Sequence, residues 1–189
     1  NNTLYYTKCT RDSKSYNNCD IYYTTKIKST DGTFRWSESK EFPKYISKKD
    51  AWDSQPTVSS DGNTIIFSSN RKGGYGKTDL YEITFENNKW GAPKNLGANI
   101  NSAEEEKSPF LHTDGKTLFF SSTNFPTLGG FDIFYSRKDS TGKWQKPINI
   151  GYPINTSTDE VSLFVSTDGK TAYFASNKLI GEGGWDIYG

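Results

Sequence analysis

Three carboxylates recur at one position of a repeated pattern, and they are the side chains best suited to chemistry. Counting back from each Asp-Gly pair of the repeat aligns them with one another, as Asp53, Glu106 and Glu160. The position before them holds Trp52, Glu105 and Asp159. Both columns precede the innermost strand of a repeat, so we expect them at a central channel or its mouth, where carboxylates could bind a cation or a basic partner. The alternatives are that these carboxylates bond neighbouring connector amides or stay solvated, and that Trp52 packs in the core or a loop instead of anchoring a partner protein.

The only histidine, His112, has no catalytic partners in the sequence. A histidine acting as a general base needs a nucleophile and an orienting group close by, whereas its own position aligns with Ser59 and Ser166 in the other repeats. The chain also lacks the G-x-S-x-G and H-E-x-x-H motifs, and its Gly pairs lead into strands and not into phosphate-binding helices. We therefore predict no catalytic residue, no metal site and no cofactor.

The two cysteines, Cys9 and Cys19, flank one polar loop near the start of the chain. If residues 3–9 and 19–25 are antiparallel neighbours, the two side chains lie near each other at the mouth of the hairpin, and a disulfide is expected there. The alternative is a pair of free thiols in a cytosolic protein. A metal site is disfavoured, because two ligands without a nearby histidine leave the coordination of the metal unfilled.

A repeated stretch must position these residues. It runs from Asp114 to Phe134, reads DGKTLFFSSTNFPTLGGFDIF, recurs from Asp61 and Asp168, and opens the chain as a truncated copy. A second shared stretch, W-x-x-P-x-N-[LI]-G-x-x-I-N, begins at two tryptophans, with a degenerate version at a third. These tryptophans, Trp36, Trp90 and Trp144, are 54 residues apart. Such a period indicates a repeat architecture.

Each repeat predicts four short antiparallel strands. Residues 106–112 and 117–122 flank an Asp-Gly turn, residues 131–137 follow a Gly-Gly pair, and a fourth strand starts at Trp144. Without helical periodicity, this pattern is typical of a propeller blade, so the predicted fold class is an all-β propeller with blades of about 54 residues.

The same repeat spacing divides the chain into blades and parts of blades. Residues 53–96 and 106–150 are full blades, residues 1–46 supply the last three strands of one and residues 160–189 the first three strands of another. An open arc of blades leaves a bare face at each end. Closing the ring would take sequence absent from this chain, a strand exchange between the two ends, or a partner.

Composition excludes several classes of function. Only 32% of the residues are hydrophobic while 15% are aromatic, so a few large rings per repeat must form the core. The formal charge of +1 gives no basic stripe for nucleic acid, and no apolar run is long enough to span a membrane. Because the sequence begins and ends inside a repeat, we expect it to be part of a longer chain.

Residues repeated in every blade are expected to be structural. One set of aspartates precedes an Ile or Leu and an aromatic residue: Asp20, Asp79, Asp132 and Asp186. We predict that these carboxylates accept backbone N–H bonds at the entry to the third strand and fix the Gly loop before it. The three repeated tryptophans are expected to pack the outer strand over the blade, with stacking on a sugar as the alternative.

The motifs DG-x-T-[LIA]-x-F-[SA]-S, GG-x-D-[IL]-[YF] and W-x-x-P-x-N-[LI]-G-x-x-I-N resemble the WD40-like PD40 propeller repeat, which also forms the TolB propeller. The chain is most similar to the propellers of Bacteroidetes envelope proteins of the OmpA family, in particular PorE-type peptidoglycan-associated lipoproteins of the type IX secretion system. The resemblance implies a periplasmic scaffold associated with the outer membrane. Its partners would be other envelope proteins, and peptidoglycan would be held by domains absent from this chain.

Two classes of function follow. The first is a non-catalytic interaction module whose blades present loops and a channel mouth to other proteins. The second is a propeller that binds or cleaves carbohydrate, although the sialidase Asp-box pattern is not matched here because Gly directly follows Asp. Cleavage would require two carboxylates about 5 to 10 Å apart in a cleft. A third possibility, the propeller cap of a serine peptidase, would place the chemistry in another domain.

Overall fold

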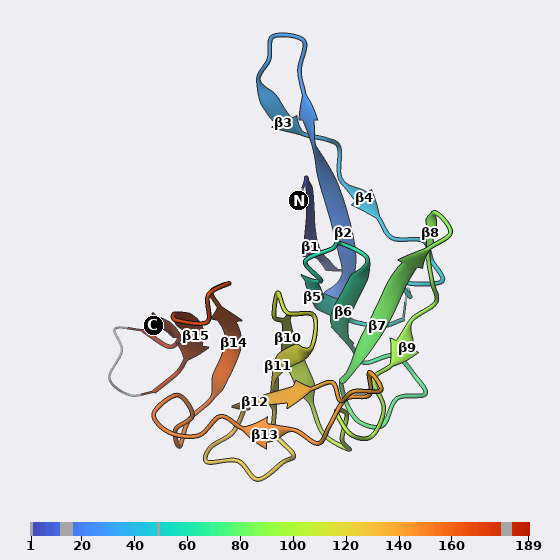
Figure 1. The fold of residues 1–189 in the computed structure, drawn as a ribbon. Helices are drawn as coiled ribbons and strands as arrows, with labels where there is room; N and C mark the ends of the chain where they lie inside the picture. The colour runs from blue at the N-terminus through green and yellow to red at the C-terminus, as the bar shows by residue number, and fades with distance from the viewer. Residues whose placement is uncertain (1, 12–16, 49, 179–182) are drawn as a thin grey trace.

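The fold is built from β-strands. The computed structural model describes residues 2–11, 17–48, 50–178 and 183–189, and these residues form sixteen strands and no helix. The strands pair in four antiparallel sheets that follow one another around an arc, as the blades of a propeller do (Figure 1). The predicted fold class, an all-β propeller, is confirmed. No described segment forms a helix long and apolar enough to cross a membrane.

Each sheet is made of strands that are consecutive in the sequence. The first sheet contains β1 (Thr3–Arg11), β2 (Asn17–Lys28), β3 (Phe34–Trp36) and β4 (Lys40–Glu41). The second contains β5 (Asp53–Val58), β6 (Thr64–Ser69), β7 (Asp79–Glu86), β8 (Lys89–Trp90) and β9 (Lys94–Asn95). The third contains β10 (Glu106–Leu111), β11 (Thr117–Ser122), β12 (Asp132–Arg137) and β13 (Ile148–Asn149). The fourth contains β14 (Glu160–Val165), β15 (Ala172–Ser176) and β16 (Asp186–Tyr188).

The Asp-Gly turns are set by local chemistry. Gly62 and Gly115 have φ angles of 78° and 65°, in the left-handed region that glycine adopts without a Cβ penalty. Asp114 accepts the backbone N–H groups of Lys116 and Thr117 at 2.8 Å each. Burial alone would raise the pKa of Asp114, but these bonds and one from the Thr117 hydroxyl outweigh it and lower the pKa to about 2.

The innermost strands of three sheets share a β-bulge. In each, the register shifts around a non-glycine residue of positive φ, which is 56° at Gln55, 51° at Ser108 and 60° at Ser162. The side chains of these residues link the strands in sequence: Gln55 Nε2 donates to Ser108 Oγ at 3.0 Å, and Ser162 Oγ donates to Ser108 Oγ at 3.3 Å. The bulges therefore turn polar groups toward the neighbouring inner strands.

Apolar clusters between neighbouring sheets hold the arc together. Ile66 and Leu80 of the second sheet pack with Leu118 and Phe120 of the third. A similar cluster joins the first and second sheets, and another places Ile133 of the third sheet against the fourth. The arc stays open, because no strand of the first sheet contacts a strand of the fourth among the described residues.

The three repeated tryptophans differ in their surroundings. Trp144 is buried and Trp90 is half-buried against Phe42, whereas Trp36 is 51% exposed. The prediction that all three pack the outer strand is therefore wrong for Trp36. The reason is that β2 extends beyond the body of the first sheet and pairs there with β3, which carries Trp36 on a projecting hairpin (Figure 1).

A disulfide joins β1 to β2. Cys9 and Cys19 are directly opposite in the strand register, and their Sγ atoms are bonded. Residues 12–16 of the loop that they flank lie outside the described part of the chain.

Replacing both cysteines with serine is expected to lower the free energy of unfolding by about 2–3 kcal/mol, because a cross-link that closes a short loop restricts the unfolded chain. Urea denaturation of the oxidised protein and the double variant measures the loss. The intact mass must also rise by two hydrogen atoms when the protein is reduced. An unchanged mass, or equal stability of the two proteins, would contradict the bridge.

Candidate functional site

The three repeated carboxylates at the start of the innermost strands are buried. Asp53 is 1% exposed, and Glu106 and Glu160 are 0% exposed. Glu106 accepts the backbone N–H of Ser102 at 2.8 Å and the hydroxyl groups of Ser102 and Ser122 at 2.5 and 2.8 Å. Glu160 makes the same set of bonds with Thr156 and Ser176. Each carboxylate therefore ties the incoming connector to the end of the second strand of its blade.

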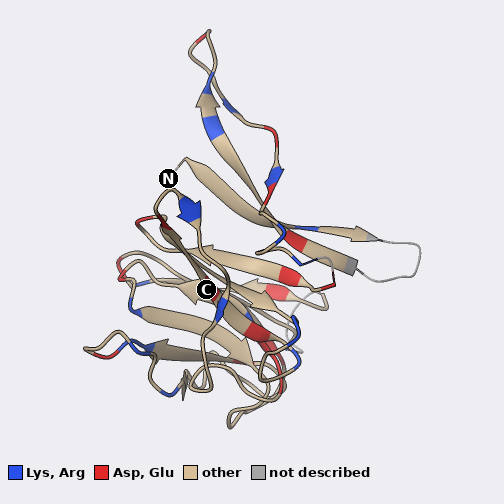
Figure 2. Cartoon of the chain, turned by 90° about the vertical axis from the view of Figure 1, so that its right-hand side faces the viewer, with Lys and Arg blue, Asp and Glu red and all other residues tan. Residues whose placement is uncertain are grey.

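This arrangement corrects the prediction that Asp53, Glu106 and Glu160 face an open channel or its mouth, and it matches the alternative that they bond neighbouring connector amides. Their side chains turn toward the connector, where donors of this chain satisfy them, so they are inaccessible to a metal ion from solvent or to a basic partner protein. Figure 2 shows acidic positions recurring near one end of neighbouring strands. Burial raises the pKa of Glu106, although the bonds from Ser102 and Ser122 oppose the rise.

In the second sheet, the guanidinium of Arg71 pairs with the buried carboxylate of Asp53. Arg71 Nη2 lies 2.8 Å from Asp53 Oδ1 and donates at 2.8 Å to the carbonyl of Ile46, in the connector from the first sheet. The guanidinium carbon also lies 5.1 Å from the ring centre of Phe67 and 4.9 Å from that of Tyr81. Both charged side chains are almost fully buried. The role of Arg71 had no signal in the sequence beyond its being an arginine just after the second strand.

The repeated aspartates at the entry to the third strand fix the Gly loops. Asp79 accepts the backbone N–H groups of Tyr75 and Gly76 at 2.7 and 3.2 Å, and Asp132 binds Leu128 and Gly129 at the same distances. An asparagine from the W-x-x-P-x-N motif donates to each carboxylate, Asn95 in the second sheet and Asn149 in the third. A second asparagine of the motif, Asn101 or Asn155, clamps the third strand by bonding both backbone groups of one residue.

These asparagines belong to the motif W-x-x-P-x-N-[LI]-G-x-x-I-N, which by itself indicated no role for them. Their recurrence beside the repeated aspartates was the available signal. Asp186 belongs to the same column, but residues 179–182 of the loop before it are outside the described residues.

The first sheet departs from this network. At the positions of Asn95 and Asn101 it has Glu41 and Ser47, and Asp20 accepts a bond from the side-chain amide of Asn18 at 3.3 Å. Burial, followed by the charges of Glu41 and Asp53, raises the pKa of Asp20, while Lys44 opposes the rise. The folded protein therefore binds a proton at Asp20 more tightly than the unfolded chain does.

Asp20→Asn is expected to raise Tm at pH 7, because asparagine removes a negative charge that burial and the charges of Glu41 and Asp53 disfavour in the folded state. With the folded pKa raised, the stability linked to this group is complete below the ordinary pKa of 3.8 and is lost as pH rises through the folded value. The gain in Tm should therefore disappear below that pH. Thermal melts of both proteins across this range test it, with Asp132→Asn as a control that should be destabilising at pH 7. A lower Tm for Asp20→Asn at pH 7 would contradict the assignment.

Five half-buried residues connect three sheets next to the buried carboxylates. Lys107 Nζ lies 5.9 Å from the ring centre of Trp52, 5.3 Å from that of Phe131, and 2.8 Å from Glu105 Oε2. The backbone N–H of Phe131 donates to Asp159 Oδ1 at 2.8 Å. We call these five residues the Trp52 cluster. It brings together the column of Trp52, Glu105 and Asp159, while Lys107 and Phe131 are members that the sequence analysis missed.

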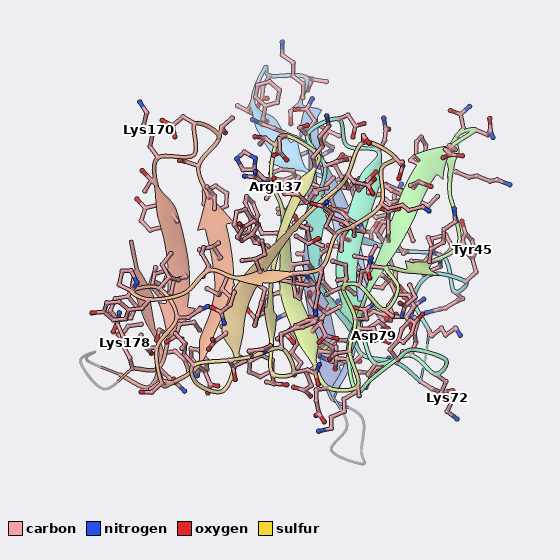
Figure 3. The ribbon with its side chains drawn as sticks, turned by 60° about the horizontal axis from the view of Figure 1, so that its bottom comes forward. Tyr45, Lys72, Asp79, Arg137, Lys170 and Lys178 are labelled. Carbon is pink, nitrogen blue, oxygen red and sulfur yellow. A yellow bond between two sulfur atoms is a disulfide. The ribbon has the colours of Figure 1, made fainter. Side chains whose placement is uncertain are left out.

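A groove of about 420 Å³ lies between the outer edges of the first two sheets. Aromatic rings dominate its lining, with Tyr5, Tyr23, Phe42, Tyr45 and Trp90 the principal contributors. Tyr45 lies at this outer edge (Figure 3), and its hydroxyl donates to the carbonyl of Trp90 at 2.9 Å. None of the described residues lining the groove is a carboxylate.

Neither a catalytic histidine nor a metal site is evident in the described part of the chain. His112 Nδ1 lies 3.5 Å from Asp114 Oδ2 beside a hairpin turn, and accepts the backbone N–H of Asp114 at 3.4 Å. No group of three or more His, Cys, Asp or Glu side chains suited to a metal ion occurs among the described residues.

Known proteins resemble this chain in structure. Neither a protein-family model nor a curated protein sequence matches it. The chain is similar to TolB from Acinetobacter baumannii, with a TM-score of 0.55, 15% identity and coverage of 96% of this chain and 36% of TolB. It is similar to an endo-arabinase from Bacteroides thetaiotaomicron, with a TM-score of 0.55, 15% identity and coverage of 98% and 70%. For the tricorn protease the TM-score is 0.52, at 9% identity with coverage of 94% and 19%.

The chain thus spans about a third of the length of TolB and about a fifth of that of the tricorn protease. At these identities the similarity establishes the fold and not the activity. The arc of sheets has the β-propeller fold, which is similar to the folds of TolB and of the endo-arabinase.

Proposed function

We propose that this chain is a non-catalytic interaction module that holds other proteins of the cell envelope. The Trp52 cluster is the observation that carries the proposal. The equivalent carboxylates Asp53, Glu106 and Glu160 are occupied by structural bonds, whereas the cluster beside them differs between repeats and keeps half-buried aromatic and charged side chains. Aromatic residues surrounded by polar groups are typical anchors of protein interfaces.

The sequence resemblance adds a cellular location to the proposal. It favours a periplasmic protein associated with the outer membrane, such as a component of the type IX secretion machinery, with peptidoglycan bound by other domains. The Cys9–Cys19 disulfide supports an oxidising compartment such as the periplasm.

Affinity capture after mild crosslinking in the cell envelope tests this function. We expect the tagged protein to retain envelope proteins and Trp52→Ala to retain at least about tenfold less, because removing a central aromatic anchor costs more than about 1.4 kcal/mol. Tyr152→Ala is the matched control, because Tyr152 is 83% exposed and lies outside the cluster. Equal capture by all three proteins would reject the Trp52 cluster as the contact, and capture of no envelope protein would reject the scaffold.

The aromatic groove favours a second candidate function, binding of a neutral carbohydrate. Flat aromatic rings pack against the apolar faces of sugars, and Asn88 and two threonines in the lining supply polar groups for hydroxyls. The lack of a carboxylate in the described lining favours binding over cleavage, which needs two of them.

Titration calorimetry with neutral oligosaccharides tests the groove. Tyr45→Ala, which changes a half-exposed ring of the lining, should abolish the binding heat, whereas Tyr152→Ala should leave it unchanged. The absence of any heat with the unmodified protein would reject this second function.

A further inference from the structure

A cavity of about 450 Å³ lies at the internal junction of the first and second sheets, between their connector and the loop after β6. Its buried part is formed by Ser47, Ala51 and Arg71, which are 1%, 5% and 7% exposed. We call it the Arg71 cavity. It shares no lining residue with the aromatic groove or with the Trp52 cluster. Its volume lies within the roughly 300–1,000 Å³ of sites that bind small molecules.

Two cations replace an aromatic residue at this place in the repeat. In the third sheet, Phe125 packs on the core, with its ring centre 5.3 Å from that of Phe134. The residue equivalent to Phe134 in the second sheet is Tyr81, and the guanidinium carbon of Arg71 lies 4.9 Å from its ring centre. Lys72, whose side chain is exposed, occupies the position of Phe125 itself. An apolar cover in one blade is thus replaced by two positive charges in the other.

The guanidinium of Arg71 is held in place and keeps one nitrogen free. Nε donates to Ser69 Oγ at 2.8 Å, and Nη2 donates at 2.8 Å to both the carbonyl of Ile46 and the carboxylate of Asp53. Nη1 has no acceptor among the described residues. Because the other bonds already fix this side chain, a ligand that accepts from Nη1 costs little side-chain entropy.

Ser47 supplies a second unused donor. Its Oγ is buried and has no hydrogen-bond partner among the residues that the structure describes. In the next two blades this position holds Asn101 and Asn155, each of which bonds both backbone groups of one residue in the third strand. A buried hydroxyl without a partner costs free energy. A ligand that accepts a hydrogen bond from Ser47 would recover that cost.

The rim of the cavity is mainly basic. Three lysines and one carboxylate, all exposed, form it: Lys44, Lys48, Lys72 and Asp50. Lys44 is paired with Glu41. Neither Lys48 nor Lys72 forms an ion pair with any described residue. Unpaired positive charge above a buried guanidinium and hydroxyl favours an anionic ligand.

We propose that the Arg71 cavity binds the phosphate group of a small phosphate ester. Its donors are Nη1 of Arg71 and Oγ of Ser47 in the buried part, and the Nζ atoms of Lys48 and Lys72 at the rim. A phosphate group offers at least three strong acceptor oxygens and a carboxylate only two, so phosphate matches this number of donors better. The volume leaves room for the group that carries the phosphate.

NMR titration of the isotope-labelled 189-residue chain with inorganic phosphate and with glycerol 3-phosphate tests the proposal. We expect saturable shifts at the amides of Ser47, Ala51 and Lys72 with both probes, and tighter binding of the ester. Ser47→Ala should raise Kd at least about tenfold, because it removes a hydrogen bond to a charged group. The same variant should not lower Tm, because the hydroxyl bonds nothing in the free protein.

A double variant of the rim, Lys48→Ala with Lys72→Ala, should also raise Kd at least about tenfold through the loss of two charges that contact the phosphate. Lys170→Ala is the matched control and should leave Kd unchanged. Lys170 is an exposed lysine in the turn between β14 and β15, and it lies on the opposite side of the molecule from Lys72 (Figure 3).

Several results would overturn the proposal. One is a set of shifts that do not saturate, or that affect Lys170 as strongly as Lys72, because such shifts indicate weak binding to surface lysines in general. Acetate binding as tightly as phosphate would assign the cavity to carboxylates instead. Binding of inorganic phosphate without glycerol 3-phosphate would exclude an ester. An unchanged Kd in both Ser47→Ala and the double lysine variant would place the bound phosphate elsewhere.

Discussion

Arg71→Met is expected to lower the free energy of unfolding by about 3–5 kcal/mol, the range for breaking a buried ion pair by removing one partner. The substitution keeps much of the apolar volume against Phe67 and Tyr81 but leaves the Asp53 carboxylate, 1% exposed, without its cation. It also removes a donor from the carbonyl of Ile46, in the connector between the first two sheets. At about 2–4 °C per kcal/mol for a chain of this size, Tm should fall by roughly 10 °C.

A charge-neutral double variant separates loss of the ion pair from loss of packing. In Arg71→Met with Asp53→Asn, the buried negative charge is gone, so part of the stability should return. The exposed neighbour Lys72 provides the control, and Lys72→Met should change stability by less than about 0.5 kcal/mol. Thermal and urea denaturation of the four proteins measure these differences. A double variant no more stable than Arg71→Met would show that unpaired charge is not the cause.

Glu106→Ala is expected to lower the free energy of unfolding by about 3 kcal/mol, because it leaves one buried donor and two partly buried donors without an acceptor. The affected donors are the backbone N–H of Ser102 and the hydroxyl groups of Ser102 and Ser122. The connector between the second and third sheets should loosen with them. Hydrogen exchange at the Ser102 amide should therefore accelerate more than exchange in β12, which keeps its strand pairing.

The adjacent carboxylate is the matched control for this prediction. Glu105 belongs to the same segment but is half-exposed and pairs with Lys107, so Glu105→Ala should cost less than about 1 kcal/mol. Equal losses for Glu105→Ala and Glu106→Ala would contradict the role of the buried bonds. So would unchanged exchange at the Ser102 amide.

The propeller could be predicted from sequence because its signals are local. An Asp-Gly pair specifies a hairpin through the positive φ of glycine and the bonds of the aspartate to nearby backbone, as at Asp114 and Gly115. Repetition of that turn at a fixed spacing then indicates stacked blades. The same reasoning placed Asp79 and Asp132 correctly beside their loops, because their donors lie three or four residues away.

For the buried carboxylates, the sequence left two surroundings open, a channel mouth and bonds to connector amides, and only the structure decided for the second. Their column was found by counting back from the turn along a strand in which side chains alternate between faces. The bulges at Gln55, Ser108 and Ser162 insert a residue into that count and reverse the face. The residue types at these three positions did not indicate a bulge, because serine and glutamine adopt positive φ only rarely.

The repeat, the hairpins and the residues that recur within them follow from local sequence patterns. Which of these equivalent residues are covered depends on how the sheets pack. Leu80, Ile133 and Ile187 occupy one position of the repeat, but the first two are 0% exposed and the third is 80% exposed. Likewise, Lys107 meets Trp52 and Arg71 meets Ile46 across blade boundaries. The physical reason is that local chemistry fixes the conformation of each blade, whereas burial depends on which other sheet lies against it.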